Sequence, residues 1–179
     1  MLDSKRIKEA EQNVRNYLDS GLLKKQDFKI QIYNILLENS KDSFETSNFL
    51  FQNDKSDLWV IVSSYYSMYY IANAVLYKLG YKIGDKISHK VTSDSLIFFV
   101  RDKLKKIFIE DYETAQAEAL SSIKADTLVY EYDKERIKRS RIQYETTKIE
   151  KHSKAITSLN RAKNFTFELR KLLIDDFIE

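Results

Sequence analysis

The chain of 179 residues contains no proline and only three glycines, so residues that favour sharp turns are scarce. An average globular chain has roughly 5% proline and 7% glycine, about nine and a dozen residues at this length. A β-sandwich or barrel needs a turn about every 8–12 residues, commonly built from such residues. Phosphate-binding loops of Rossmann and P-loop folds need clustered glycines, and Gly21, Gly80 and Gly84 form no such cluster. The sequence therefore predicts a mostly helical chain with short connections.

Apolar residues at helical spacing predict helices along most of the chain. The expected helices cover residues 3–19 (ending at Gly21), 27–53 (capped by Asp27), 57–79, 92–107 (capped by Thr92 or Ser93), 109–132 and 147–173. In the second and the last of these helices, one set of apolar side chains is expected to face the core. These residues are Ile32, Ile35, Leu36, Phe44, Phe49, Leu50, Ile156, Leu159, Ala162, Phe165, Leu169, Leu172 and Leu173. Residues 81–90 form the one substantial loop. We expect an all-α, up-and-down bundle of four to six helices in a single domain, with residues 1–26 as a helical extension and 27–175 as the bundle.

The segment 58–77 has no charged residue and is as long as a membrane span. It includes three serines, Asn73 and five tyrosines, whose polar groups would need partners in lipid. We therefore expect the central helix of a bundle and no membrane insertion. The absence of cysteine and the charged N-terminal segment, which is unlike a signal peptide, favour a cytoplasmic protein.

Four tyrosines of this helix form two i,i+4 pairs on adjacent faces: Tyr65, Tyr66, Tyr69 and Tyr70. Aromatic stripes at helical spacing favour core packing with the hydroxyls hydrogen-bonded across helices. The alternatives are a stacking platform for bases or a dimer interface.

Charge is unevenly distributed along the second half of the chain. Residues 108–133 contain one basic and seven acidic side chains, whereas residues 134–171 contain twelve basic and four acidic side chains. The basic block begins with a cluster that suits phosphate and base binding: Arg136, Lys138, Arg139, Arg141 and Tyr144. Neutralisation of this block by the neighbouring acidic segment is an equal alternative.

The chain has only two histidines, and they differ in their surroundings. His89 lies between Lys86 and Lys90 just before an expected helix, where it could titrate near neutrality or contact an anion. His152 is expected to face solvent. Without cysteine or a carboxylate pattern around either histidine, we expect no metal site and no cofactor.

The segment from Trp59 to Leu96 resembles the central helix, loop and following helix of HEPN-domain proteins, in particular their small single-domain prokaryotic branch. The paired tyrosines and the long apolar helix ending in glycine match the family pattern, and Ser88 and His89 match its Thr/Ser-His pair. Arg139 and Tyr144 match a later arginine and tyrosine, with Gln143 where the family usually has aspartate. The likeness covers about residues 30–173.

This resemblance implies a bundle that forms a homodimer and acts as a ribonuclease toxin in defence or toxin–antitoxin systems, as an RNA- or nucleotide-binding module, or as the partner of a nucleotidyltransferase. The ribonuclease members use an Arg-x4-6-His motif, and no arginine of this chain precedes a histidine at that spacing. We therefore expect RNA or nucleotide binding through a basic cleft that includes Arg136–Arg141, Tyr144 and Lys90. The alternatives are a metal-independent endoribonuclease in which His89 and Arg139 meet in the fold, and a protein-interaction module.

Overall fold

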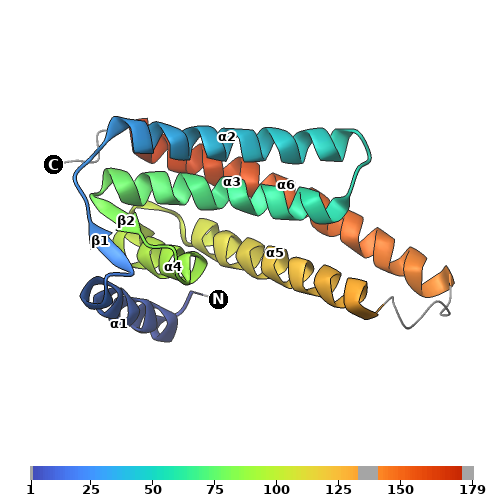
Figure 1. Cartoon of the computed structure of the whole chain (residues 1–179), viewed down its shortest axis with the longest axis horizontal. Helices are drawn as coiled ribbons and strands as arrows, with labels where there is room; N and C mark the ends of the chain where they lie inside the picture. Colours follow the sequence, from blue (N-terminus) through green and yellow to red (C-terminus); the bar gives the residue numbers. More distant parts are fainter. Residues whose placement is uncertain (1, 133–140, 175–179) are drawn as a thin grey trace.

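The computed structural model describes residues 2–132 and 141–174, with side chains at 2–123 and 150–174, and shows a helical bundle (Figure 1). Its elements are α1 (Ser4–Ser20), β1 (Leu23–Lys25), α2 (Ile30–Gln52), α3 (Asp57–Lys78), β2 (Tyr81–Ile83), α4 (Ser88–Phe99), a 3-10 turn (Arg101–Lys103), α5 (Lys106–Tyr132) and α6 (Arg141–Ile174). The expected all-α bundle is confirmed within the described residues.

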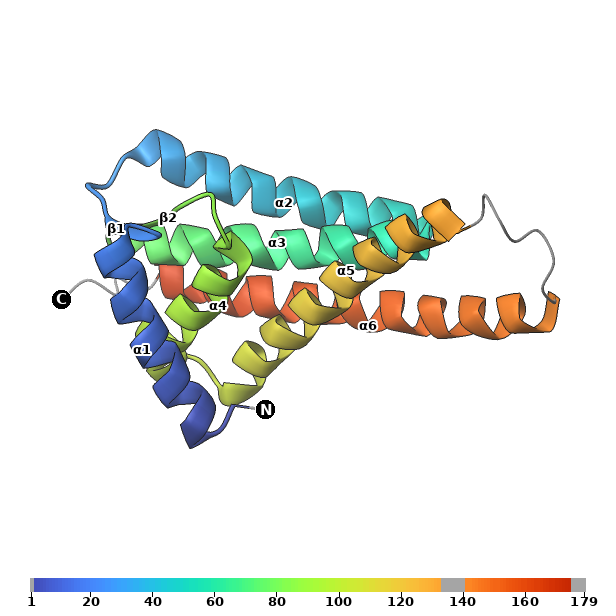
Figure 2. The same ribbon diagram turned by 60° about the horizontal axis from the view of Figure 1, so that its bottom comes forward.

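The helix α3 forms the centre of the bundle. It contacts α2, α4, α5 and α6, and its buried side chains Tyr65, Met68 and Ile71 are fully enclosed. The long helices α2, α3 and α6 run side by side, whereas Figure 2 shows α1 and α4 together at one end and α5 crossing obliquely. A helix that is apolar on nearly all sides needs neighbouring helices around it to bury its side chains, and this central position provides them. Among the described residues, no helix is long and apolar enough to cross a membrane.

The first helix begins and ends where its sequence predicts. The carboxylate of Asp3 accepts a hydrogen bond from the backbone N–H of Arg6 at 2.8 Å, which satisfies one of the free donors at the helix start. Gly21 ends the helix in the left-handed conformation with φ 73°, which glycine adopts without a steric penalty.

Two predicted helix starts are wrong because β1 and β2 pair with each other. Residues 23–25 form an antiparallel ladder with 81–83, so α2 begins at Ile30 and Asp27 is not its cap. The expected loop 81–90 contains β2 and the first turn of α4, which begins at Ser88 and not at Thr92. This ladder joins segments more than fifty residues apart, and local patterns do not reveal such pairing.

The close approach of β1 and β2 depends on Gly84. Its N–H donates to the carbonyl oxygen of Leu22 at 2.8 Å. A Cβ at this position would lie 3.1 Å from that oxygen, so a larger residue would push the chains apart.

The predicted inward faces of α2 and α6 are partly wrong. Ile35, Phe49 and Ile156 are 55%, 60% and 40% exposed. The buried positions of α2 include Ser40, whose hydroxyl donates to the carbonyl of Ser67, and Ser47, whose hydroxyl lies 2.6 Å from that of Ser64. Small hydroxyl side chains therefore let α2 and α3 approach closely, and the larger apolar residues turn outward. The last helix also begins earlier than predicted, at Arg141 instead of Thr147.

A buried ionic cluster, which no sequence pattern predicted, connects α1 with α4 and α5. Asp94 of α4 is fully buried, and its carboxylate pairs with Arg6 at 2.7 Å. It also accepts hydrogen bonds from Asn13 at 3.0 Å and Tyr17 at 2.8 Å. Arg6 pairs in addition with Glu113 of α5 at 2.8 Å. Because a buried carboxylate is tolerated only when its oxygens have partners, we assign this cluster to the fold and not to a binding site.

Candidate functional site

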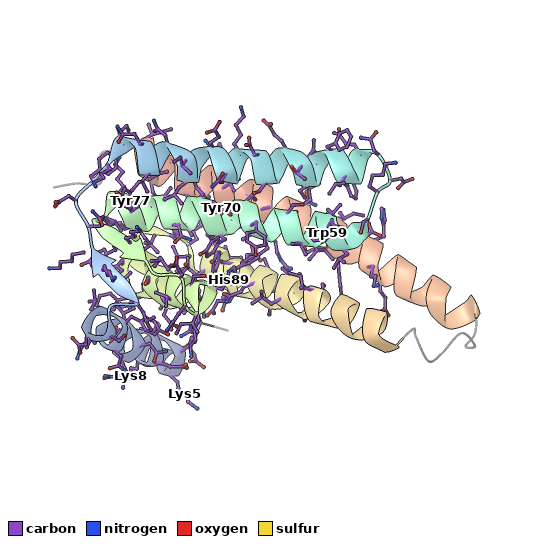
Figure 3. The ribbon with its side chains drawn as sticks, in the orientation of Figure 1. Lys5, Lys8, Trp59, Tyr70, Tyr77 and His89 are labelled. Atoms are coloured by element: carbon purple, nitrogen blue, oxygen red, sulfur yellow. The ribbon has the colours of Figure 1, made fainter. Side chains whose placement is uncertain are left out.

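His89 lies in the first turn of α4 and packs against the tyrosines of α3 (Figure 3). The ring centroids of Tyr65, Tyr66 and Tyr69 are 5.5, 5.8 and 4.7 Å from that of the imidazole. The Nδ1 atom is 2.8 Å from the hydroxyl oxygen of Tyr65. His89 is half-buried, so one side of its ring remains accessible.

The hydrogen bond to Tyr65 orients the imidazole of His89. Burial raises the pKa of Tyr65, so its hydroxyl stays protonated and needs an acceptor. Its partner is Nδ1 of His89, so this ring nitrogen is occupied by the hydrogen bond to Tyr65 and Nε2 is the nitrogen left for other contacts. Burial also lowers the pKa of His89, which keeps the ring neutral at neutral pH.

The four tyrosines of the two i,i+4 pairs on α3 have two different roles. Tyr65 is fully buried in the core, as the core-packing interpretation predicts. Tyr66, Tyr69 and Tyr70 are half-buried, and each forms part of a pocket wall. Trp59, Tyr66, Tyr70 and Tyr77 follow one another at steps of seven, four and seven residues, which places them on one face of α3. Figure 3 shows Trp59, Tyr70 and Tyr77 along this helix.

A pocket of about 300 Å³, here called the β2 pocket, opens between α2, α3 and the segment from β2 to α4. Its aromatic lining comes from α3 and β2, with apolar side chains of α2 opposite. The lining residues are Ile32, Leu36, Tyr69, Tyr70, Asn73, Tyr77, Tyr81, Lys82, Ile83, Gly84, Asp85 and Ser88.

Asn73 supplies an oriented polar group to the β2 pocket. Its Nδ2 donates to the carbonyl of Tyr69 at 2.8 Å and to the hydroxyl of Thr92 at 3.4 Å. These two bonds fix the amide orientation, so Oδ1 is left as the acceptor available to a ligand. Tyr77 is held in a similar way, because its hydroxyl donates to the carbonyl of Asp27 at 3.2 Å.

One lysine, Lys82, lines the β2 pocket, and further lysines belong to the segments that include β1 and β2. Residues 23–29 and 81–90 together contain six lysines and two aspartates. Lys24 and Lys82 are direct cross-strand partners in the β1–β2 ladder, and both are exposed. Like charges directly opposite each other disfavour a sheet, and the two exposed ammonium groups add positive charge to this edge of the molecule. Sequence reasoning could not find this pair, since the strands are remote from each other in the chain.

A second pocket, here called the Trp59 pocket, lies further along the same helix pair and has a volume of about 350 Å³. Tyr70 forms part of the wall of both pockets. The α2 side is polar and the α3 side is largely aromatic. The lining residues are Asn39, Asp42, Ser43, Thr46, Trp59, Val62, Ser63, Tyr66 and Tyr70.

Several residues of the predicted basic cleft cannot be placed. Arg136, Lys138 and Arg139 lie outside the described residues, and Arg141 and Tyr144 belong to α6 with side chains outside the described ones. The expected meeting of His89 and Arg139 therefore stays a prediction. Lys90 is exposed beside His89.

Part of the basic block is neutralised by the acidic segment before it. Arg161 pairs with Asp111 at 3.3 Å and with Glu118 at 2.9 Å. This pairing matches the neutralisation alternative for one arginine of the block. His152 is 46% exposed, as expected, and Nδ1 lies 3.1 Å from the carboxylate of Asp57.

Among residues with described side chains, no group of three or more histidine, aspartate or glutamate side chains could hold a metal ion. The polar side chains that line the β2 pocket are tyrosine hydroxyls, the amide of Asn73, the hydroxyl of Ser88, the ammonium group of Lys82 and the carboxylate of Asp85. Comparison with known proteins identifies no match among family models, curated proteins or solved structures.

Proposed function

We propose that the protein binds RNA or a nucleotide at the β2 pocket and does not cleave it. The observation that supports this function most directly is the tyrosine-lined pocket with Lys82 in its wall and Lys24 across the strand pair. The resemblance to HEPN proteins points to the same class of ligand. A HEPN-like homodimer with a nucleotidyltransferase partner stays a prediction, as do a role in defence and a cytoplasmic location.

The shape and lining of the pocket suit a nucleobase. Aromatic side chains bind unpaired bases by stacking, and Tyr69, Tyr70 and Tyr81 offer three such rings. The Oδ1 atom of Asn73 can accept a hydrogen bond from a base N–H. A pocket of about 300 Å³ is at the lower end of the range for small-molecule sites, which favours one base over a larger group.

The lysines supply the positive charge that phosphate binding requires, and phosphate binding contributes most of the affinity of such proteins. A bound phosphate would relieve the repulsion between Lys24 and Lys82. Lys86 and Lys90 extend the positive surface toward His89. The Nε2 atom of His89, which is not engaged by Tyr65, adds a polar group that can form a hydrogen bond with the ligand.

The sequence favours binding over cleavage, because the Arg-x4-6-His motif of the ribonuclease members is absent. The hydrogen bond between Nδ1 of His89 and Tyr65 gives the imidazole a fixed orientation in the bundle. His89 therefore contributes a hydrogen bond to the ligand through its other nitrogen.

The proposal is tested by fluorescence anisotropy with a labelled single-stranded oligouridylate of about ten nucleotides. Binding should weaken steeply between about 50 and about 200 mM salt. The double variant Lys24→Gln/Lys82→Gln should bind about tenfold more weakly, with a salt slope reduced by about 0.7 for each lysine.

Lys8→Gln is the matched control, since it removes the same charge from an exposed position on α1 (Figure 3). Its affinity should equal that of the unaltered protein. Equal losses in the control and in the double variant would contradict a localised site. Binding that does not depend on salt, or none at all, would overturn the proposed function. Cleavage of the oligonucleotide that is lost in His89→Ala would replace it with the ribonuclease alternative.

A further inference from the structure

We propose that the Trp59 pocket binds an organic cation, a quaternary ammonium or a guanidinium group, held between aromatic rings and the carboxylate of Asp42. This site is separate from the β2 pocket and does not depend on the function proposed there. It is defined by a cavity of about 350 Å³ between α2 and α3.

Three aromatic rings, those of Trp59, Tyr66 and Tyr70, line the α3 side of the cavity. Trp59 is 55% exposed, which is unusual for the largest apolar side chain and leaves the indole free to contact a ligand. Tyr66 and Tyr70 pair with ring centroids 6.0 Å apart. Trp59 and Tyr66 are seven residues apart, which corresponds to about 10 Å along the helix, and Val62 and Ser63 lie between them in the lining.

The charge of the cavity is negative. Asp42 lies in its α2 wall, and within the described residues it has no ion-pair partner. Glu38 precedes it by one helical turn, an i,i+4 spacing at which like charges destabilise a helix. The neighbouring Lys41 is paired with Glu45 at 3.7 Å and is not part of the lining.

The combination of rings and carboxylate selects the ligand class. The faces of indole and phenol rings carry negative potential and attract cations, most strongly tryptophan. Asp42 strengthens this attraction and repels phosphate. The neutral remainder of the α2 wall consists of Asn39, Ser43 and Thr46, whose polar groups disfavour a purely apolar ligand. A cation with an apolar surface satisfies both kinds of wall.

Trp59 is the only tryptophan of the chain, so its fluorescence reports directly on this pocket. The protein is titrated with choline and, separately, with dimethylbutanol, the uncharged isostere of choline. A third titration uses N-acetyl-arginine amide, which presents a guanidinium as a protein side chain would. Choline or the arginine derivative should change the fluorescence saturably, and dimethylbutanol should not.

The variant Asp42→Asn keeps the shape of the side chain and removes its charge, so cation affinity should fall about two- to fivefold. Asp85→Asn, which removes an exposed carboxylate from the β2 pocket, should leave it unchanged. Thermal unfolding of both variants verifies that they fold, because Asp42 and Asp85 are exposed and make no ion pair among the described residues.

The relative strength of the two cations distinguishes the sources of the ligand. Tighter binding of choline assigns the pocket to a free quaternary ammonium, and tighter binding of the arginine derivative assigns it to a basic side chain of a protein. Either result supports the cation site. Equal binding of choline and dimethylbutanol, no saturable response to either cation, or an unchanged affinity in Asp42→Asn would overturn it.

Discussion

The β2 pocket and the Trp59 pocket are both formed between α2 and α3, share the side chain of Tyr70, and differ in the charged residues around them. The β2 pocket has Lys82 and Asp85 in its wall and Lys24 across the strand pair, whereas the Trp59 pocket has Asp42 and no basic residue in its lining. The aromatic rings on one face of α3 therefore do not by themselves determine a ligand. The difference lies in what the neighbouring elements add.

The two sets of charges have different structural origins. The lysines are brought together by the β1–β2 ladder, which joins distant parts of the chain. The carboxylates Glu38 and Asp42 are neighbours on a single helix. In both cases like charges are adjacent without a described counter-ion, an arrangement that costs stability in the free protein and is relieved by a ligand of opposite charge.

Replacement of the shared ring should have the largest effect, because it affects both pockets. In Tyr70→Leu, RNA affinity should fall about tenfold, in line with about 1–3 kcal/mol for a base stacked on an aromatic ring. Choline affinity should fall by a smaller factor, about two- to fivefold. Anisotropy and Trp59 fluorescence measure the two affinities in one preparation.

Tyr33→Leu is the matched control, since Tyr33 is a half-buried tyrosine of α2 that lines neither pocket. It should leave both affinities unchanged. A loss confined to one ligand in Tyr70→Leu would show that the ring is not shared functionally.

Reversal of the charge at position 42 should make the Trp59 pocket resemble the β2 pocket in its ligand preference. Asp42→Lys should abolish the choline response and increase RNA affinity about threefold, with a salt slope steeper by about 0.7. The reason is that the aromatic wall remains and the repulsion of phosphate is replaced by attraction. The same two titrations measure this change, and an unaltered choline affinity would contradict the role of Asp42.

Removal of one lysine should strengthen the fold while it weakens binding. In Lys82→Gln the cross-strand repulsion with Lys24 is lost, so the free energy of unfolding in urea should rise by about 0.2–1 kcal/mol. Lys8→Gln, which has no such partner in the ladder, should change it less. A decrease in stability for Lys82→Gln would show that the two ammonium groups do not repel each other in the folded protein.

The smallest effect concerns pH. Burial lowers the pKa of His89 below its usual value of 6.5, so the unfolded chain takes up this proton first as the pH falls. The stabilisation of the native protein relative to His89→Gln should be constant above about pH 7 and should decrease as the pH falls below about 6.5. Urea unfolding of both proteins at a series of pH values measures this difference, and an increase on acidification would contradict the buried neutral imidazole.

Much of the fold was predictable because helical periodicity is a local property. The apolar segment 58–77 predicted the central helix, and Asp3 and Gly21 bound α1 in the structure. The starts of α2 and α4 were not predictable, since both depend on strand pairing between residues 23–25 and 81–83. The prediction that Ile35 and Phe49 face the core was wrong, because serines and not large apolar residues lie where α2 hydrogen-bonds to α3.

The candidate site was predictable only in part. His89 and the tyrosine pairs are conspicuous in sequence because histidine is rare here and the tyrosines cluster. The lysine pair, the role of Asp42 and the buried Asp94 cluster all depend on contacts between separate elements. The placement of Lys82 near one end of the aromatic face of α3 and of Asp42 near the other depends on how the separate elements pack, so no single segment of the sequence reveals it.

The separation of the two pockets is measured most directly by the aromatic proton–carbon NMR spectrum of the protein during titration with AMP and then with choline. AMP should shift resonances of Tyr77 and Tyr81 and leave the indole of Trp59 in place. Choline should then shift the indole without displacing AMP. A shift of the Trp59 indole by AMP, a shift of Tyr77 and Tyr81 by choline, or displacement of one ligand by the other would contradict two separate pockets.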